Sequence, residues 1–322
     1  MLKDLLDSRK CFKIIAGAGN TNKEYIEKLI YVYALAGVRY FDLSADIEVV
    51  RTVKKVLKDL RIDAYITVSY GISDDPHVSK VVIDTEKCSA CGECLPMCEQ
   101  NALYLEKTMN VREDNCIGCA RCVPMCQFDA MKMVSKPKLI KETLPELVAE
   151  GIDTVELHVS AEQENDEIIN KWNDISSIYD GMLSLCIDRS HKSDTSLKKV
   201  ILTAIEGRKP YTTIIQADGC PMSGNDADPS TTLQALAIAQ IIERMKIPVY
   251  LLMSGGTNNL TSKYAKEFNL SYHGISMGSF ARKAIKKYID DPTFFGNTEL
   301  VWGAIDKAKE LINTTTAYMG GL

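Results

Sequence analysis

Eight of the eleven cysteines lie in one stretch of the chain, in two runs of identical spacing. Each run reads C-x2-C-x2-C-x3-C. The first run is Cys88, Cys91, Cys94 and Cys98, and the second is Cys116, Cys119, Cys122 and Cys126. Three thiolates at this spacing can each bind one iron of a cubane iron–sulfur cluster, whose fourth ligand comes from elsewhere in the chain. The pattern therefore predicts a segment that binds two [4Fe–4S] clusters.

In the two-cluster bacterial ferredoxin pattern, each run lends its last cysteine to the other cluster. We expect Cys88, Cys91, Cys94 and Cys126 to bind the first cluster, and Cys116, Cys119, Cys122 and Cys98 the second. The surrounding text repeats as well, since Asn101-Ala102-Leu103 matches Asp129-Ala130-Met131. Zinc is the alternative metal for these cysteines, but zinc sites usually contain two separated C-x2-C pairs. Glu99 and Gln127 replace the proline that usually follows the fourth cysteine, which bears on loop geometry rather than ligation.

The elements that must position these groups follow a regular rhythm outside the cysteine stretch. Apolar β-rich runs alternate with amphipathic helical patterns, and we expect strands at 13–16, 40–44, 64–70, 154–159, 182–188, 212–217, 249–253 and 272–276. Eight β units with intervening helices predict an α/β fold, a (β/α)8 TIM-like barrel. A doubly wound open sheet gives the same alternation, but the count of eight favours the barrel.

The cysteine stretch directly follows the third expected strand, so it interrupts the barrel as an enlarged βα loop. We assign residues 1–76 and 137–322 to the barrel and 77–136 to an inserted α+β ferredoxin-type domain. Loops after barrel strands emerge at the C-terminal face, where the active sites of such barrels lie. The clusters are therefore expected to lie over the mouth of the barrel.

Polar side chains alternate with apolar ones along the expected strands. Around residue 156, for example, Val155 and Leu157 share one face and Glu156 and His158 the other. In a barrel the polar face lines the interior, where polar groups are costly unless paired or used in chemistry. The candidate catalytic residues are Asp42, Glu156, His158, Asp188, Gln216 and Asp218. A hydrogen-bonded structural network is the alternative for this set.

The roles of His158 and of two cysteines on or near these strands are less specific. His158 is a possible acid/base partner of Glu156 or Asp188. Cys186 faces the interior by parity, and Cys220 follows the sixth strand. We interpret both cysteines as buried or incidental rather than as redox thiols.

Glycine-rich turns follow the seventh and eighth strands, at the usual phosphate-binding place of such barrels. Glycine lets backbone N–H groups approach an anion, and a helix N-terminus adds a favourable dipole. We therefore expect a phosphate of a substrate or of FMN to bind at Gly255, Gly256, Thr257, Gly278, Ser279 and Arg282. Ordinary turn chemistry is the alternative, with Ser279 suited to cap the following helix.

Composition narrows the class of protein. The 322 residues are 46% hydrophobic and 25% charged, as in a globular protein with a substantial core. A net charge of −5 without a basic cluster argues against nucleic acid as a partner. No apolar run approaches the roughly 20 residues of a membrane span, and the N-terminus lacks a signal-peptide pattern. We expect a cytoplasmic protein whose cysteines serve metal or redox chemistry.

Several motifs carry a resemblance to a known family. They are Gln216-Ala217-Asp218-Gly219, Pro221-Met222-Ser223-Gly224, Ser254-Gly255-Gly256-Thr257-Asn258, Gly278-Ser279 and Ala281-Arg282 in the C-terminal half, with Leu35-Ala36-Gly37 and Asp42-Leu43-Ser44-Ala45-Asp46 nearer the N-terminus. With the cysteine block, this text resembles the light-dependent period (LdpA-like) family of cyanobacteria. The resemblance implies an iron–sulfur protein and, in cyanobacteria, a redox sensor that tunes the circadian clock.

Two hypotheses of function follow. In the first, the chain is a ferredoxin-type oxidoreductase whose clusters exchange electrons with a small molecule or flavin in the barrel mouth. In the second, it is a redox sensor or electron carrier that signals to a partner protein without its own catalysis. Either hypothesis requires an electron donor or acceptor, which is a protein or a small molecule.

Overall fold

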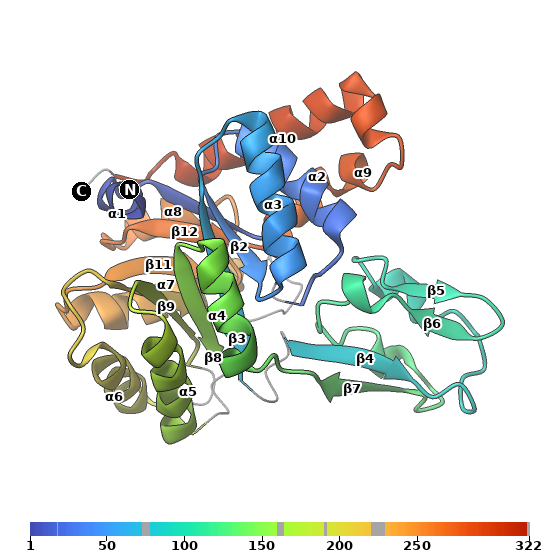
Figure 1. Ribbon diagram of the computed structural model, residues 1–322, viewed down its shortest axis with the longest axis horizontal. Helices are drawn as coiled ribbons and strands as arrows, with labels where there is room; N and C mark the ends of the chain where they lie inside the picture. The colour runs from blue at the N-terminus through green and yellow to red at the C-terminus, as the bar shows by residue number, and fades with distance from the viewer. Residues whose placement is uncertain (18, 73–77, 160–163, 190–191, 220–228, 321–322) are drawn as a thin grey trace.

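Eight parallel strands close into a barrel in the computed structural model, which describes residues 1–17, 19–72, 78–159, 164–189, 192–219 and 229–320 (Figure 1). Around the barrel the strands are β1 (Cys11–Ile15), β12 (Gly274–Met277), β11 (Tyr250–Ser254), β10 (Thr213–Asp218), β9 (Met182–Ile187), β8 (Thr154–Val159), β3 (Tyr65–Gly71) and β2 (Tyr40–Ser44). Because β1 pairs with both β2 and β12, the sheet has no edge. The predicted TIM-like barrel is confirmed, and the open-sheet alternative is wrong.

Helices surround this barrel and cover the outer face of its strands (Figure 1). They are α2 (Lys23–Leu35), α3 (Ile47–Leu60), α4 (Ile140–Glu150), α5 (Asn165–Ile178), α6 (Asp194–Ile205), α7 (Pro229–Arg244), α8 (Thr261–Glu267), α9 (Ser279–Ile289) and α10 (Thr298–Thr316), and α1 (Leu2–Asp7) precedes β1. None of the described helices is long and apolar enough to cross a membrane.

Helix α3 illustrates why these segments fold as they do. The Asp46 carboxylate accepts hydrogen bonds from the N–H groups of Glu48 and Val49, which caps the first turn. Its buried residues recur at helical spacing and pack toward the sheet: Val49, Val50, Val53, Val56 and Leu57. The helix ends where Arg61 adopts a left-handed conformation, with φ of 55°.

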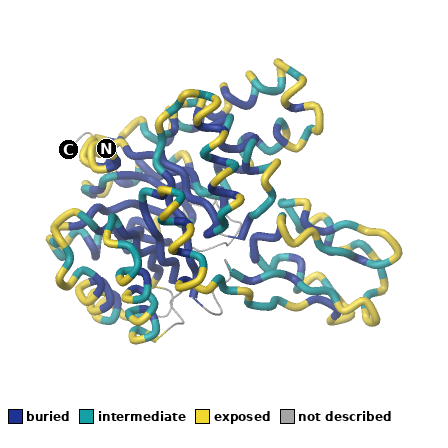
Figure 2. Tube along the Cα trace, in the orientation of Figure 1, coloured by how far each residue is buried: buried dark blue, intermediate teal, exposed yellow. Residues whose placement is uncertain are grey.

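The interior of the barrel is layered along its axis. At the N-terminal end, apolar side chains fill the interior and pack against Leu2 and Leu6 of α1; these are Cys11, Tyr40, Ile214, Tyr250 and Leu252. Above them the inward positions are polar and buried, whereas the outward positions, such as Val155 and Leu157, join the core beneath the helices. Apolar side chains thus close the N-terminal end of the barrel, and the buried polar side chains lie toward its C-terminal mouth. Figure 2 shows the buried strands at the centre of this arrangement.

The cysteine stretch forms a separate small unit between β3 and α4, as an insertion that projects from one side of the barrel (Figure 1). It contains two antiparallel pairs, β4 (Ser79–Ile83) with β7 (Met131–Ser135) and β5 (Leu103–Leu105) with β6 (Met109–Val111). Short 3-10 turns follow each cysteine triplet, at Leu95–Met97 and Val123–Met125. These turns lie 28 positions apart, as do the two halves of the cysteine pattern, so the sequence repeat is also a structural repeat.

The second half of the insertion lies against the barrel. Thr21 N–H donates to the Asp114 carbonyl at 2.9 Å, and the Asn22 amide donates to Asn115 Oδ1 at 2.7 Å. Lys80 Nζ donates to the Glu113 carbonyl at 2.8 Å and to the Gly19 carbonyl. The segment after β1 therefore holds the loop that leads into the second cysteine run.

Candidate functional site

The cysteines of the insertion gather in a small core of their own. Cys94, Cys116 and Cys122 are buried there, and Cys88, Cys98 and Cys126 are partly buried beside them. Burial raises the pKa of the Cys94 thiol, and the neighbouring Cys91, Cys126 and Cys88 raise it further. Burial likewise raises the pKa of Cys122 to about 12, together with Cys119, Cys98 and Cys116. These two neighbourhoods are the two predicted ligand sets, and they support the ligand pairing, which stays a prediction.

The last cysteine of each run accepts a backbone hydrogen bond. Ala102 N–H donates to Cys98 Sγ at 3.2 Å, and Ala130 N–H donates to Cys126 Sγ at 3.3 Å. Such bonds stabilise thiolate charge and tune the reduction potential of a bound cluster. The donor set of eight cysteines, arranged in this repeated way, fits two [4Fe–4S] clusters.

The two predicted clusters differ in their surroundings. The loop of the second run touches the barrel, since Asp114 and Asn115, just before Cys116, accept hydrogen bonds from Thr21 and Asn22. In the first run Cys91 is exposed, and Phe128 nearby has 49% of its surface exposed. The second ligand set therefore lies on the barrel side of the insertion, and the first has a face toward solvent.

A buried lysine connects the polar side chains in the middle of the barrel. Lys13 Nζ lies 2.6 Å from Asp42 Oδ2 and 2.6 Å from Glu156 Oε2. The Gln216 amide donates to Glu156 and to the Ser184 hydroxyl, the latter at 3.0 Å. The interior thus holds one cation and two carboxyl groups in a continuous hydrogen-bonded network. Three predicted site residues, Asp42, Glu156 and Gln216, meet here.

Sequence reasoning missed Lys13, although its signal was present. Phe12 and Ile14 flank it on the apolar face of β1, so parity alone directs Lys13 into the barrel. Burial lowers the pKa of Lys13, but Asp42 and Glu156 outweigh burial and raise it above its ordinary value. Burial and the charge of Glu156 raise the pKa of Asp42 to about 6. Lys13 therefore stays protonated and positively charged.

A second set of side chains lies one residue pair further toward the mouth. His158 Nε2 is 2.9 Å from Asp218 Oδ2, and Cys186 Sγ is 3.6 Å from the same oxygen. All three side chains are buried. Burial raises the pKa of the Cys186 thiol well above its usual range. His158 thus pairs with Asp218, which was not among the partners proposed from the sequence, Glu156 and Asp188.

Asp188 follows β9 and is buried. Its charge acts on Lys192, whose pKa is lowered by burial and raised by Glu164 and Asp188, with a net decrease. Cys220 and the loop after Gly219 lie outside the described residues.

The glycine turns after β11 and β12 are closely packed. A Cβ on Gly256, which has φ of +73°, would lie 2.5 Å from Thr231 Cβ, and the Gly256 carbonyl accepts hydrogen bonds from Thr231 and Thr232. Thr257 Oγ1 donates to the Ser276 carbonyl at 2.6 Å. Tight packing against α7 therefore accounts for Gly256 without a ligand. Gly255, beside it, has φ of 51°.

At the second glycine turn, Gly278 is the N-cap of α9 and Ser279 is its first residue. The expected capping role of Ser279 is wrong, because the chain enters the helix one residue earlier. Arg282, which is 5% exposed, donates from Nη1 to the Ile15 carbonyl at 2.8 Å. Its Nε has no hydrogen-bond partner among the described residues. A phosphate or FMN site at these turns stays a prediction.

A cavity of about 250 Å³ lies between the barrel mouth and the insertion. Ser69, Gly71 and Asp46 line it from the barrel, and Lys80 and Asp114 from the insertion. Ligand pockets usually measure about 300–1,000 Å³. This cavity suits a small molecule better than a flavin.

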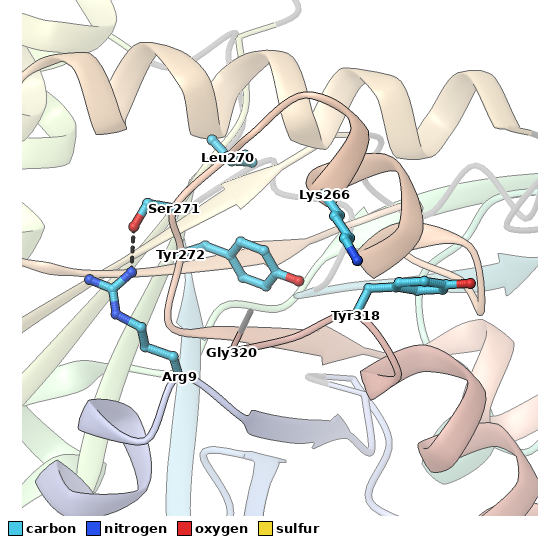
Figure 3. A pocket seen from close by; sticks show the side chains of 7 residues that line it. All are labelled: Arg9, Lys266, Leu270, Ser271, Tyr272, Tyr318 and Gly320. Carbon is cyan, nitrogen blue, oxygen red and sulfur yellow. Dashed lines mark hydrogen bonds between the residues drawn. The ribbon is translucent and has the colours of Figure 1, made fainter. Parts of the chain in front are cut away.

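A second pocket, at the opposite end of the barrel, is too small for a ligand. Figure 3 shows Arg9, Ser271, Tyr272 and Tyr318 around it, with Arg9 donating to the Ser271 hydroxyl. Its volume is about 20 Å³, enough for about one water molecule.

Comparison with known proteins identifies the family. The light dependent period A C-terminal domain matches residues 146–314, more than half of the chain. The chain belongs to the light dependent period A family. A 4Fe-4S dicluster domain matches residues 87–130, and a protein family of unknown function matches residues 1–67. The family and the iron–sulfur nature expected from the sequence are thereby confirmed.

Two individual proteins illustrate the similarity. Light dependent period A of Synechococcus elongatus is 26% identical over 337 aligned residues, covering 99% of this chain and 94% of that protein. The YdjI aldolase of Escherichia coli K12 has a similar structure, with a TM-score of 0.53 at 8% identity, covering 99% of this chain and 96% of that one. At this identity the aldolase shows a shared barrel fold and says nothing of activity.

Proposed function

We propose that this chain is an iron–sulfur oxidoreductase in which electrons move between two [4Fe–4S] clusters and a small-molecule site at the C-terminal mouth of the barrel. The observation that carries the proposal is the position of the insertion. The loop that leads into its second cysteine run lies against the segment after β1, and the cavity beside it opens between the insertion and the polar end of the barrel. Clusters held beside this cavity would be in a position to exchange electrons with a molecule bound at the mouth.

The exposed face of the first cysteine run supports an order of transfer. Each cluster, when bound, supplies one-electron chemistry. Cys91 is exposed, and Met125 and Phe128 present exposed apolar surface beside that run. A small redox protein therefore docks there and exchanges electrons with the first ligand set. The second set, against the barrel, is the nearer of the two to the mouth.

The barrel residues can handle the protons that accompany reduction of a small molecule. His158 Nε2 and Asp218 Oδ2 share a hydrogen bond, so a proton can be held or moved at this pair. Lys80, Lys136 and Lys138 line the cavity. Lys136 forms an ion pair with Glu113, and Lys138 with Asp46. The size of the cavity favours a small polar substrate over FMN.

The test is anaerobic purification followed by iron and sulfide analysis, visible and electron paramagnetic resonance spectra, and acid extraction of bound compounds. We expect about eight irons per chain, one-electron reduction of both clusters and a released small molecule. The substitutions Glu156→Gln and Asp218→Asn should leave the clusters intact but block the re-oxidation of reduced protein by that molecule. Clusters that re-oxidise equally fast in these variants would contradict the enzyme proposal.

A redox sensor is the second candidate, favoured by the full-length similarity to Light dependent period A. In that case the oxidation state of the clusters changes contacts with a partner protein. Cells that carry the Glu156→Gln and Asp218→Asn variants would then behave like wild type, whereas Cys119→Ser would abolish function. The opposite pattern, with loss of function in the barrel variants, favours the enzyme. The cytoplasmic location remains a prediction in both cases.

A further inference from the structure

We propose that His158, Cys186 and Asp218 form a mononuclear zinc site inside the barrel, separate from the cysteines of the insertion. The clusters themselves do not need this site, but it shares His158 and Asp218 with the proposed function, and a zinc ion would replace the hydrogen bond between these two side chains. It goes beyond the proposed function and does not depend on it, because zinc binding is independent of whether electrons reach the barrel.

Three neighbouring strands deliver the ligands to one point. His158 on β8 is the register partner of Cys186 on β9, and Asp218 ends β10, the next strand around the barrel. One ligand atom from each residue lies within 4.8 Å of the other two. In a tetrahedral zinc site with bonds of about 2.0 Å to N or O and 2.3 Å to S, ligand atoms lie roughly 3.3–3.6 Å apart. The 3.6 Å between Cys186 Sγ and Asp218 Oδ2 meets this, and the 2.9 Å between His158 and Asp218 needs to widen by a few tenths of an ångström.

The burial of the three groups points to a cation. His158 is 6% exposed, and Cys186 and Asp218 are each 2% exposed. Asp218 Oδ1 has no hydrogen-bond partner among the described residues, although a buried carboxylate oxygen without a partner is costly. Two residues before His158 on the same strand face, Glu156 belongs to a layer with two carboxyl groups and one lysine. A divalent cation would neutralise Asp218 and suit the acidic layer below.

The arrangement does not suit a nucleophilic triad. In such a triad the histidine stands between the thiol and the carboxylate. Here Asp218 Oδ2 contacts both the His158 ring and the Cys186 sulfur, and Cys186 also hydrogen-bonds with His158, so each group contacts the other two and the three converge on a common centre. The mixture of imidazole, thiolate and carboxylate is a donor set for zinc.

Three protein ligands leave the fourth position of zinc open, as in catalytic zinc sites. The class of ligand that fits is a small molecule with a carbonyl or carboxylate oxygen. Gly71, the register partner of His158 on β3, also lines the cavity at the mouth. The zinc would thus polarise such an oxygen in a molecule that enters from the mouth.

The test measures zinc and iron in full-length protein with its clusters intact, purified anaerobically from zinc-containing medium. We expect about one zinc per chain beside the cluster iron. The Cys186→Ala variant should lose zinc at least tenfold without loss of iron. Cys11→Ala is the matched control, because Cys11 is also fully buried in the barrel interior but lies at its N-terminal end.

Zinc X-ray absorption of the wild type keeps the test decisive if a variant fails to fold. One sulfur at about 2.3 Å with nitrogen and oxygen ligands at about 2.0 Å supports the site. Zinc with three or four sulfur ligands places the metal in the insertion and overturns the proposal. Less than about a tenth of a zinc per chain, both as purified and after anaerobic addition of ZnCl2 and desalting, also overturns it. Iron content and cluster spectra, recorded on the same samples, report the proposed redox function separately.

Discussion

Single residues in this chain act mainly through buried charge. Lys13 lies 2.6 Å from each of two carboxylates and is 1% exposed, so all three charges depend on one another. Desolvation of such groups is costly, and their mutual attraction offsets that cost only while every partner is present. The network is therefore a point where one substitution has a large effect on stability.

Replacing Lys13 with methionine should lower the free energy of unfolding by about 3–5 kcal/mol, because Asp42 and Glu156 are left buried without their cation. Urea unfolding under anaerobic conditions measures the change. Lys263→Met on the surface of α8 is the control, and its exposed ion pair with Glu267 predicts a change within about 0.5 kcal/mol. The double variant Lys13→Met/Glu156→Gln should recover part of the loss. A loss below about 1 kcal/mol in Lys13→Met would contradict this account.

At the scale of elements, the βα turns are shaped by close packing. Gly256 follows β11 with φ of +73° and lies directly against Thr231 of α7. Gly207, after α6, has the same φ of +73° but nothing within 4 Å of the position of a Cβ. Replacing each glycine with alanine therefore separates the cost of backbone strain from the cost of steric overlap between the new Cβ and its neighbours.

Gly207→Ala should therefore cost about 1–2 kcal/mol, since alanine disfavours a left-handed conformation. Gly256→Ala should cost a further 1–3 kcal/mol or so, because its methyl group overlaps the backbone of α7. Thermal unfolding of both variants side by side gives the comparison. Equal losses in the two variants would show that packing of α7 against this turn carries no weight.

At the scale of the whole molecule, the barrel and the insertion differ in what holds them together. The barrel has an extensive apolar core, whereas the core of the insertion is small, and three of its eight buried residues are cysteines. A unit of this size commonly requires metal or disulfides to fold. We therefore expect the iron–sulfur clusters to stabilise the fold of the insertion as well as to carry electrons.

Removal of iron should unfold the insertion and leave the barrel folded. Hydrogen exchange of anaerobic protein, before and after oxidative removal of iron with a chelator, measures this for each segment. We expect protection to be lost across residues 79–135 and to persist in β8, β9 and β10. Retained protection in β4 and β7 without iron would show that the insertion folds independently of its clusters.

The sequence by itself determined the features that depend on local spacing. Cysteines separated by two or three residues lie within reach of one metal cluster whatever the rest of the chain does. The iron–sulfur segment was therefore predictable. The alternation of apolar and polar residues set which side chains face the barrel interior, and eight repeats of it predicted the closed sheet. The insertion after the third strand followed from the order of these patterns.

Only the tertiary structure decided which inward side chains meet. Lys13 reaches Glu156 across 143 residues of sequence, and His158 reaches Asp218 across 60. These contacts depend on strand register and on the closure of the barrel, which no local pattern encodes. For the same reason the glycine after β11 could be read from the sequence as an anion-binding turn, whereas in the fold α7 packs against it.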